Sequence, residues 1–106
     1  MAAILGNDEN FNELLESNEK LIVKFYADWC GVCKKIKPRY NRLSEDEKYT
    51  GVKFVEMKAD LNPKTRLAAG VYSLPFFATY NEGEMKGKVT SGDERQVVGL
   101  LDELVA

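Results

Sequence analysis

The 106-residue sequence contains no histidine, and this absence excludes several common kinds of active site. Serine or cysteine nucleophiles that depend on a histidine base need an imidazole. Zinc sites with imidazole ligands are excluded for the same reason. We therefore expect neither a histidine-dependent hydrolase nor a metal centre, and no residue is assigned as a metal ligand.

Cysteine is also scarce, and both cysteines, Cys30 and Cys33, lie in one short segment. Two thiolates cannot complete a tetrahedral structural zinc site, and two cysteines do not make a disulfide-rich scaffold. The alternatives to a redox pair are half of a zinc site, an iron–sulfur site that bridges a dimer, and two incidental buried cysteines.

Excess charge of one sign and long apolar runs are missing as well. Lysine and arginine number 15 against 17 acidic residues, so no positive field favours nucleic acid as a partner. No apolar stretch approaches the roughly 20 residues of a membrane span, and residues 1–8 do not resemble a signal peptide. The absence of linkers and repeats predicts a single domain over residues 1–106. We expect a soluble, cytoplasmic monomer that acts on no membrane.

The spacing of the apolar residues predicts alternating strands and helices. Residues 21–27 form a continuous β-prone run, which is typical of a central strand buried on both faces. Residues 52–57 predict a second strand, and residues 76–80 and 85–89 predict a hairpin. With a weak first strand, the order is β-α-β-α-β-α-β-β-α. This order predicts an α/β fold, with a mixed central sheet and helices on both faces.

Capping and turn residues predict where the helices begin and end. The expected starts are Asn7 or Asp8, Asn62 followed by Pro63, and Asp93. A helical stretch from about residue 30 to residue 49 contains Pro38, which we expect to kink it or to end its first half. Gly70 can end the short helix that follows Pro63. Basic residues occupy the first turns of the long helix: Lys34, Lys35, Lys37 and Arg39. They indicate either a solvated helix face or a surface that favours acidic targets.

The segment from Trp29 to Lys34 carries the chemistry of this sequence. Cys30 lies where a strand ends and a helix begins, next to unpaired N–H groups and the positive end of the helix dipole. That position stabilises a thiolate, which is the nucleophile of disulfide exchange. Cys33 lies one turn further on, more buried and within reach. The pair therefore predicts a reversible dithiol catalyst, with one attacking and one resolving cysteine.

The segment 26–34 resembles the active-site segment of the thioredoxin family, and the resemblance extends over nearly the whole chain. Further matches to the family pattern are Pro38, the segment 60–63, Leu74-Pro75, Gly83 and Gly92. The resemblance implies the thioredoxin fold. It also implies a reaction in which Cys30 attacks a target disulfide, forms a mixed disulfide, and is then attacked by Cys33.

The resemblance also implies the partners of this reaction. They are proteins that carry a reducible disulfide, and a flavin- and NADPH-dependent thioredoxin reductase that reduces Cys30 and Cys33 again. No bound cofactor is implied, because the two thiols are themselves the redox group.

A second segment, Ser73-Leu74-Pro75, is expected to face the two cysteines. In the family this loop contains a cis-proline, and its backbone can pair with an extended target peptide. The alternative is that Pro75 is an ordinary proline at the start of a strand. Trp29 is expected to form a platform beside the cysteines, or to be a partly buried aromatic residue, or both.

Gly31 belongs to the segment that matches the family, but the sequence departs from the family pattern at three other positions. Val32 replaces the usual proline between the cysteines. Lys24 replaces a buried acid, and Glu56 replaces the lysine that often pairs with it, so the charge pair is inverted. We expect Lys24 and Glu56 to pair near the cysteines. The alternative is that the Lys24 stem is buried while its ammonium reaches water, with Glu56 facing solvent.

Three functions remain open at this stage. The first is a thiol–disulfide oxidoreductase that reduces target proteins. The second is a binding module or complex subunit of the same fold, in which redox activity is incidental. The third is an oxidase or isomerase, which would require an oxidising compartment. The joint presence of Cys30, Cys33, Trp29 and Pro75 favours the first.

Overall fold

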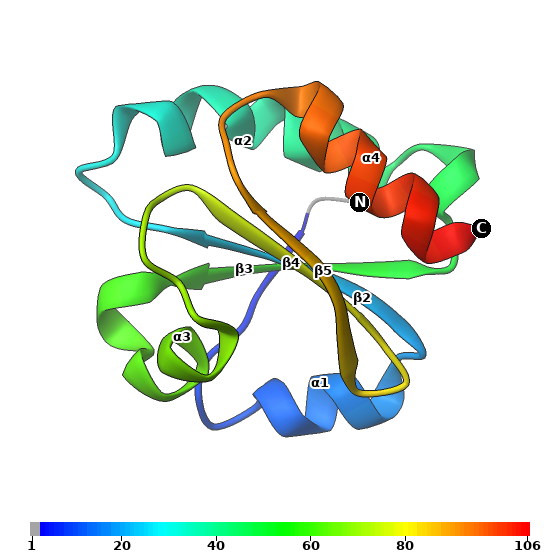
Figure 1. Cartoon of the computed structure of the whole chain (residues 1–106), viewed down its shortest axis with the longest axis horizontal. Helices are drawn as coiled ribbons and strands as arrows, with labels where there is room; N and C mark the ends of the chain where they lie inside the picture. The colour runs from blue at the N-terminus through cyan, green and yellow to red at the C-terminus, as the bar shows by residue number, and fades with distance from the viewer. Residues whose placement is uncertain (1–2) are drawn as a thin grey trace.

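The computed structural model describes residues 3–106, which fold around one five-stranded sheet (Figure 1). The strands lie in the order β1-β3-β2-β4-β5. Their bounds are β1 Ile4–Leu5, β2 Lys20–Tyr26, β3 Val52–Lys58, β4 Phe76–Asn81 and β5 Glu84–Thr90. Strands β1 and β2 pair parallel with β3, whereas β4 pairs antiparallel with both β2 and β5. The predicted mixed sheet is confirmed, and the first strand, expected to be weak, has only two residues.

Within residues 3–106, four helices cover the two faces of this sheet. They are α1 Phe11–Ser17, α2 Gly31–Ser44, α3 Pro63–Ala69 and α4 Glu94–Val105, and the short 3₁₀ turns are η1 Glu47–Tyr49 and η2 Ala59–Leu61. Figure 1 shows α2 and α4 on one face and α1 and α3 on the other. This arrangement confirms the predicted α/β architecture.

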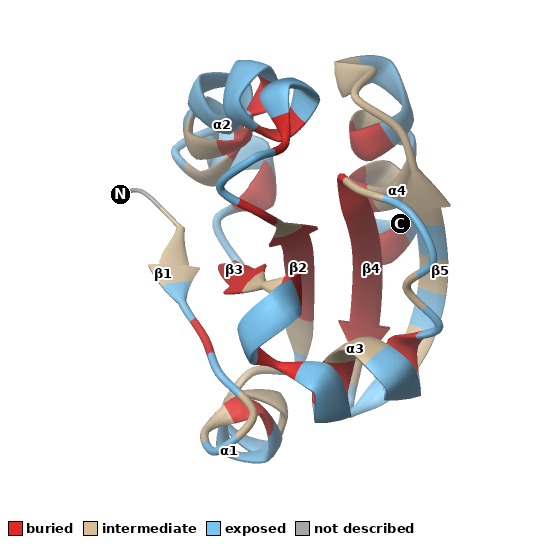
Figure 2. Cartoon of the chain, turned by 90° about the vertical axis from the view of Figure 1, so that its left-hand side faces the viewer, coloured by how far each residue is buried: buried red, intermediate tan, exposed pale blue. Residues whose placement is uncertain are grey.

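Strand β2 has an almost continuous apolar sequence because both of its faces are covered. Leu21 and Val23 contribute to the core beneath α1 and α3, whereas Ile22 contributes to the core beneath α2 and α4. Figure 2 shows β2 and β4 buried along most of their length. Lys24 interrupts the run on the α2 side, directly opposite Glu56 of β3 in the strand register. The two charged residues are therefore placed side by side by the sheet itself.

The predicted start of the first helix is wrong. Helix α1 begins at Phe11, and Asn10 occupies the capping position without a capping hydrogen bond from its side chain. Asn7 and Asp8 precede the helix, and the Asn7 side chain accepts from the Asn10 backbone N–H at 2.8 Å. Asp8 points to a different helix.

The Asp8 carboxylate caps α3, more than fifty residues further along the chain. It accepts hydrogen bonds from the backbone N–H groups of Lys64 at 3.0 Å and Thr65 at 2.9 Å, and from the Thr65 hydroxyl at 2.7 Å. Asn62 precedes the helix and Pro63 begins it, as predicted, but the Asn62 side chain makes no capping bond. Its amide instead donates to the Lys58 carbonyl at 2.8 Å.

The long helix is shorter than predicted and is not ended by its proline. Helix α2 continues through Pro38 to Ser44, and residues 47–49 form the separate turn η1. A buried stripe holds both halves of α2 on the sheet: Cys33, Ile36, Tyr40 and Leu43. Burial of this stripe offsets the backbone hydrogen bond that proline cannot make.

The remaining boundaries agree with the sequence. Gly70 ends α3 with a φ of 76°, a left-handed conformation that favours glycine. The Asp93 side chain accepts a hydrogen bond from the Arg95 backbone N–H and caps α4. The hairpin of β4 and β5 turns through Glu82 and Gly83, both of which have positive φ.

Candidate active site

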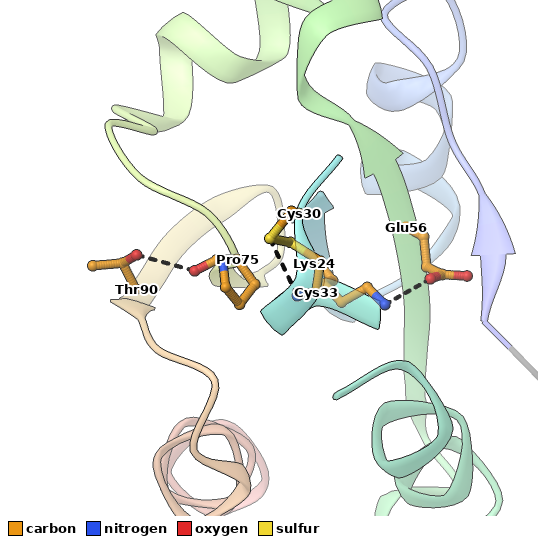
Figure 3. Close-up of a disulfide and its surroundings, with 6 residues drawn as sticks. All are labelled: Lys24, Cys30, Cys33, Glu56, Pro75 and Thr90. Atoms are coloured by element: carbon orange, nitrogen blue, oxygen red, sulfur yellow. Dashed lines mark hydrogen bonds and ion pairs between the residues drawn. A yellow bond between two sulfur atoms is a disulfide. The ribbon is translucent and has the colours of Figure 1, made fainter. Parts of the chain in front are cut away.

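Cys30 and Cys33 lie where β2 ends and α2 begins, and they are joined by a disulfide (Figure 3). Their Cα atoms are 5.3 Å apart. Cys30 is the capping residue of α2, and its sulfur accepts a hydrogen bond from the Cys33 backbone N–H at 3.2 Å. The first sulfur therefore lies at the helix N-terminus, where N–H groups and the helix dipole favour negative charge.

The two cysteines differ in exposure in the direction the sequence predicts. Cys30 is 7% exposed and Cys33 is 2% exposed. They form a small apolar cluster with Ala27, and Tyr26 and Leu74 pack against it. Leu74 brings the loop before β4 into contact with the disulfide.

That loop has the geometry that the resemblance implies. The Leu74–Pro75 peptide bond is cis, and Figure 3 shows Pro75 beside the disulfide. The Pro75 carbonyl accepts a hydrogen bond from the Thr90 hydroxyl of β5 at 3.0 Å. Thr90 was not predicted as a site residue, since nothing in its local sequence distinguishes it from other strand residues.

Trp29 is 77% exposed, so it is not a partly buried aromatic residue. Its ring lines a groove of about 610 Å³ next to the disulfide. The groove is lined by Ala27, Trp29, Ala59, Asp60, Arg66, Val71, Tyr72, Ser73 and Leu74. The expected substrate-binding residues other than Pro75 thus border one groove. Gly31 and Val32 are also exposed, on the first turn of α2.

Lys24 and Glu56 form a buried ion pair, as predicted. Lys24 Nζ lies 2.8 Å from Glu56 Oε2, and the two residues are only 1% and 6% exposed (Figure 3). The alternative in which the ammonium reaches water and the carboxylate faces solvent is therefore wrong. The parallel register of β2 and β3 forces the contact, because it places the two Cα positions opposite each other on one face.

A third charge, Lys37 of α2, completes this cluster. Its ammonium lies 3.2 Å from Glu56 Oε1 and 3.3 Å from Oε2, while its side chain is 55% exposed. One carboxylate therefore faces two ammonium groups. Lys37 is one of several basic residues in the first turns of α2, and its spacing in the sequence does not predict that it, rather than its neighbours, pairs with Glu56.

Burial lowers the pKa of Lys24 below its usual value. The hydrogen bond and the charge of Glu56 oppose this shift, and the nearby Lys37 ammonium adds to it. The ammonium also lies 5.2 Å from the centre of the Tyr40 ring, a cation–π contact. Burial, and then the charge of Glu56, raise the pKa of Tyr40 well above 10, so this ring stays neutral beside the pair.

A cavity of about 230 Å³ connects the ion pair with the second cysteine. Its lining residues are Lys24, Tyr26, Ala27, Asp28, Cys33, Lys34, Lys37 and Glu56. A water molecule occupies about 30 Å³ in the liquid, so the cavity has room for a short chain of water molecules between Cys33 and the Glu56 carboxylate.

A sequence model of the thioredoxin family matches residues 2–103. The chain belongs to the thioredoxin family. It is 43% identical over 91 residues to thioredoxin of Rickettsia typhi, with 86% of this chain and 84% of that protein covered. It is 35% identical over 97 residues to thioredoxin of Bos taurus, with 90% of each covered. Mitochondrial thioredoxin-3 of Saccharomyces cerevisiae is 34% identical over 85 residues, which cover 80% of this chain and 65% of that protein.

Solved structures of thioredoxins share this fold. The oxidised form of yeast mitochondrial thioredoxin 3 superposes with a TM-score of 0.88 at 28% identity, and 96% and 95% of the two chains are covered. Spinach chloroplast thioredoxin f gives a TM-score of 0.92 at 20% identity, over 99% and 95%. The five-stranded sheet with its four helices is the thioredoxin fold.

The protein is thus a thioredoxin-type thiol–disulfide oxidoreductase, a disulfide reductase whose redox group is the CxxC pair. Family membership implies target proteins with disulfides and a reductase that returns the pair to the dithiol. Within residues 3–106, no helix combines the length and the apolar character needed to cross a membrane.

Proposed function

We propose that Cys30 is the attacking thiol and Cys33 the resolving thiol in the reduction of target-protein disulfides. In the reduced protein the Cys30 thiolate attacks one target sulfur and forms a mixed disulfide with it, while the other target sulfur leaves as a thiolate and takes up a proton. Cys33 then loses its proton and attacks Cys30 Sγ, which releases the target sulfur bound to Cys30, again as a thiol once protonated. Two electrons have passed to the target, and the Cys30–Cys33 disulfide remains.

The position of the Cys30 sulfur at the start of α2 carries this assignment. The Cys33 backbone N–H points to it at 3.2 Å, and the helix dipole adds to the effect of that bond. Both favour the thiolate at the first cysteine. Cys33 is less exposed and is oriented toward Cys30, which suits attack on the mixed disulfide rather than on a target.

The buried charges suggest how Cys33 loses its proton. Lys24, Glu56 and Lys37 carry a net charge of +1 when all are ionised, and a positive site favours a thiolate nearby. Lys24 and Glu56 share the lining of one cavity with Cys33. We assign Glu56 as the proton acceptor, or a neutral fraction of Lys24, whose lowered pKa makes that form more accessible.

The target is proposed to bind across Trp29 and the loop Ser73-Leu74-Pro75. The exposed indole offers a platform beside the disulfide, and the loop offers backbone groups for an extended peptide. Thr90 supports this arrangement, because its hydroxyl holds the Pro75 carbonyl in place.

The partner that restores the dithiol is proposed to be a thioredoxin reductase, since the two electrons lost in each cycle must be replaced. The proposed setting is the cytoplasm, where thiols are kept reduced, and the proposed form is a single-domain monomer. Cell fractionation and size-exclusion chromatography test these two points, and a mitochondrial or chloroplast location, or a dimer, would contradict them.

Reduction of insulin disulfides by dithiothreitol tests the cysteine assignment. The wild-type protein is expected to accelerate the reaction, whereas Cys30→Ser should lose this effect completely. Cys33→Ser should instead trap a covalent complex with the substrate that dithiothreitol releases. A wild-type protein without activity would contradict the reductase, and trapping by Cys30→Ser would reverse the two roles.

A further inference from the structure

The groove beside the disulfide contains a cation, Arg66, that forms no ion pair with any of residues 3–106. Arg66 lies on the last turn of α3 and lines this groove. Its Nε is buried and has no hydrogen-bond partner among residues 3–106. No carboxylate of the described chain lies within 4 Å of its guanidinium. A buried donor without an acceptor is unfavourable, and such groups are few in folded proteins.

The groove lies beside the disulfide, on the side of the loop that contains Ser73 and Leu74. Leu74 belongs both to the groove lining and to the cluster that packs on the two cysteines. Trp29 and Tyr72 also line the groove, and each is 77% exposed. Two large exposed aromatic side chains bordering a hollow are typical of a surface that binds another chain.

The charges in the groove indicate the chemistry of that chain. Its lining contains one cation, Arg66, and one acid, Asp60. Asp60 is exposed and therefore hydrated, whereas the Arg66 Nε is removed from water. The buried Nε is out of reach of an incoming group, so a carboxylate would contact the rest of the half-exposed guanidinium and supply the anion that Arg66 lacks. An incoming ammonium at Asp60 would instead displace water from a carboxylate that is already hydrated.

We propose that Arg66 selects target segments that carry an aspartate or glutamate near the reactive cysteine. The two terminal nitrogens of the guanidinium lie side by side, which matches the two oxygens of a carboxylate. This inference deepens the proposed reductase function and depends on it. The occupant of the groove is an extended segment of a target protein, bound through backbone pairing at Ser73–Pro75 and through this side-chain contact.

Fluorogenic disulfide peptides test the proposal. A series is made in which glutamate, glutamine or lysine occupies each of the four positions on either side of the cysteine. For the wild-type protein we expect kcat/KM to be about three- to tenfold higher with glutamate than with glutamine at one or two positions. Arg66→Gln should abolish this preference, and Arg66→Glu should transfer it to the lysine peptides. Added salt should reduce it.

The control variant is Lys35→Gln. Lys35 is exposed on α2, outside both the groove and the cavity below Cys33. Loss of the preference in this variant would assign acidic targets to the basic face of α2 and overturn the proposal. Equal rates for the three peptides, or a preference that survives Arg66→Gln, would overturn it as well.

A small aromatic disulfide that carries no charged group separates the preference for acidic targets from the reductase function. Its rate of reduction should be unchanged in Arg66→Gln and Lys35→Gln, because neither residue contacts the sulfur atoms. A wild-type protein that fails to reduce it would contradict the proposed function itself. Circular dichroism of each variant shows whether α3 has stayed folded.

Discussion

Gly92 lies so close to the side chain of Val32 that a Cβ atom at position 92 would collide with Val32 Cγ1. The loop before α4 and the residue between the two cysteines are thus fitted to each other. Val32 is 48% exposed, and its buried part includes the contact with Gly92. A side chain at residue 92 would therefore have to displace Val32 from its present position.

We expect Gly92→Ala to lower the free energy of unfolding by about 1–2 kcal/mol, because the new methyl group overpacks the site. The rate of insulin reduction should fall with it. Gly99→Ala is the matched control, since a Cβ at residue 99 of α4 meets nothing within 4 Å. The double change Val32→Ala with Gly92→Ala should restore stability. If the double variant is as unstable as Gly92→Ala, the collision with Val32 is not the cause of the lost stability.

Val32→Pro is expected to make the disulfide harder to reduce. A proline stiffens the loop between Cys30 and Cys33, whereas valine leaves it more freedom. The equilibrium constant against glutathione should change by about three- to tenfold, which corresponds to about 15–30 mV toward a lower potential. A redox titration followed by tryptophan fluorescence measures the change. An unchanged or higher potential would show that residue 32 does not set it.

The Lys24–Glu56 pair should show strong coupling in a double-mutant cycle. Glu56→Gln leaves a buried ammonium without its closest partner, and the expected loss of stability is roughly 3 kcal/mol. It should also slow the resolution of the mixed disulfide. The exchange Lys24→Asp with Glu56→Lys should recover much of both losses. Additive effects of the two single changes would mean that the residues do not couple.

The structure adds a condition to that exchange. Lys37 lies within 3.3 Å of both carboxylate oxygens of Glu56, so a lysine at position 56 would meet a second ammonium. Recovery should therefore be incomplete until Lys37→Gln is added. Lys35→Gln in the same background is the control, because Lys35 does not contact the pair.

In the reduced protein, Cys30 should react with limiting iodoacetamide before Cys33 at neutral pH. The helix N-terminus favours the Cys30 thiolate, and the Cys33 thiol is the less exposed. Peptide mass spectrometry measures the ratio. Labelling that begins at Cys33 would contradict the assignment of the attacking thiol.

Above pH 10 the protein should lose stability through its buried tyrosines. Burial raises the pKa of Tyr80 to about 12, so the folded state keeps a proton that the unfolded state loses near pH 10. The contribution is present below pH 10 and is lost as the pH rises to 12, by roughly 3 kcal/mol. Urea unfolding at several pH values measures it. Tyr80→Phe should flatten the decline.

The parts of this fold that were predictable are those whose signal lies within a few residues. The continuous apolar run of β2 requires cover on both faces, and this fixed the α/β class. Cys30 and Cys33 follow that run directly, so their position at a helix start could be derived from spacing alone. Lys24 was identified as needing a partner because it interrupts the run.

The parts that were missed depend on contacts between distant segments. Asp8 precedes α1 and has the sequence context of a cap for that helix, yet the folded chain brings it to α3. The Thr90 hydroxyl donates to the carbonyl of Pro75, which lies 15 residues earlier in the sequence. Arg66 lines a groove whose other residues come from several segments of the chain. No periodicity in the sequence reports such distances, since only the packed sheet establishes them.

The capping bond from Asp8 to α3 has a consequence for how the protein opens and closes. A helix of seven residues is too short to persist alone, and this one receives its N-terminal acceptor from a residue 56 positions earlier. Helix α3 and the segment 7–10 should therefore come apart as one cooperative unit, and their amides should share a single hydrogen-exchange rate. The groove wall that contains Arg66 therefore persists only while the segment 7–10 stays docked on α3.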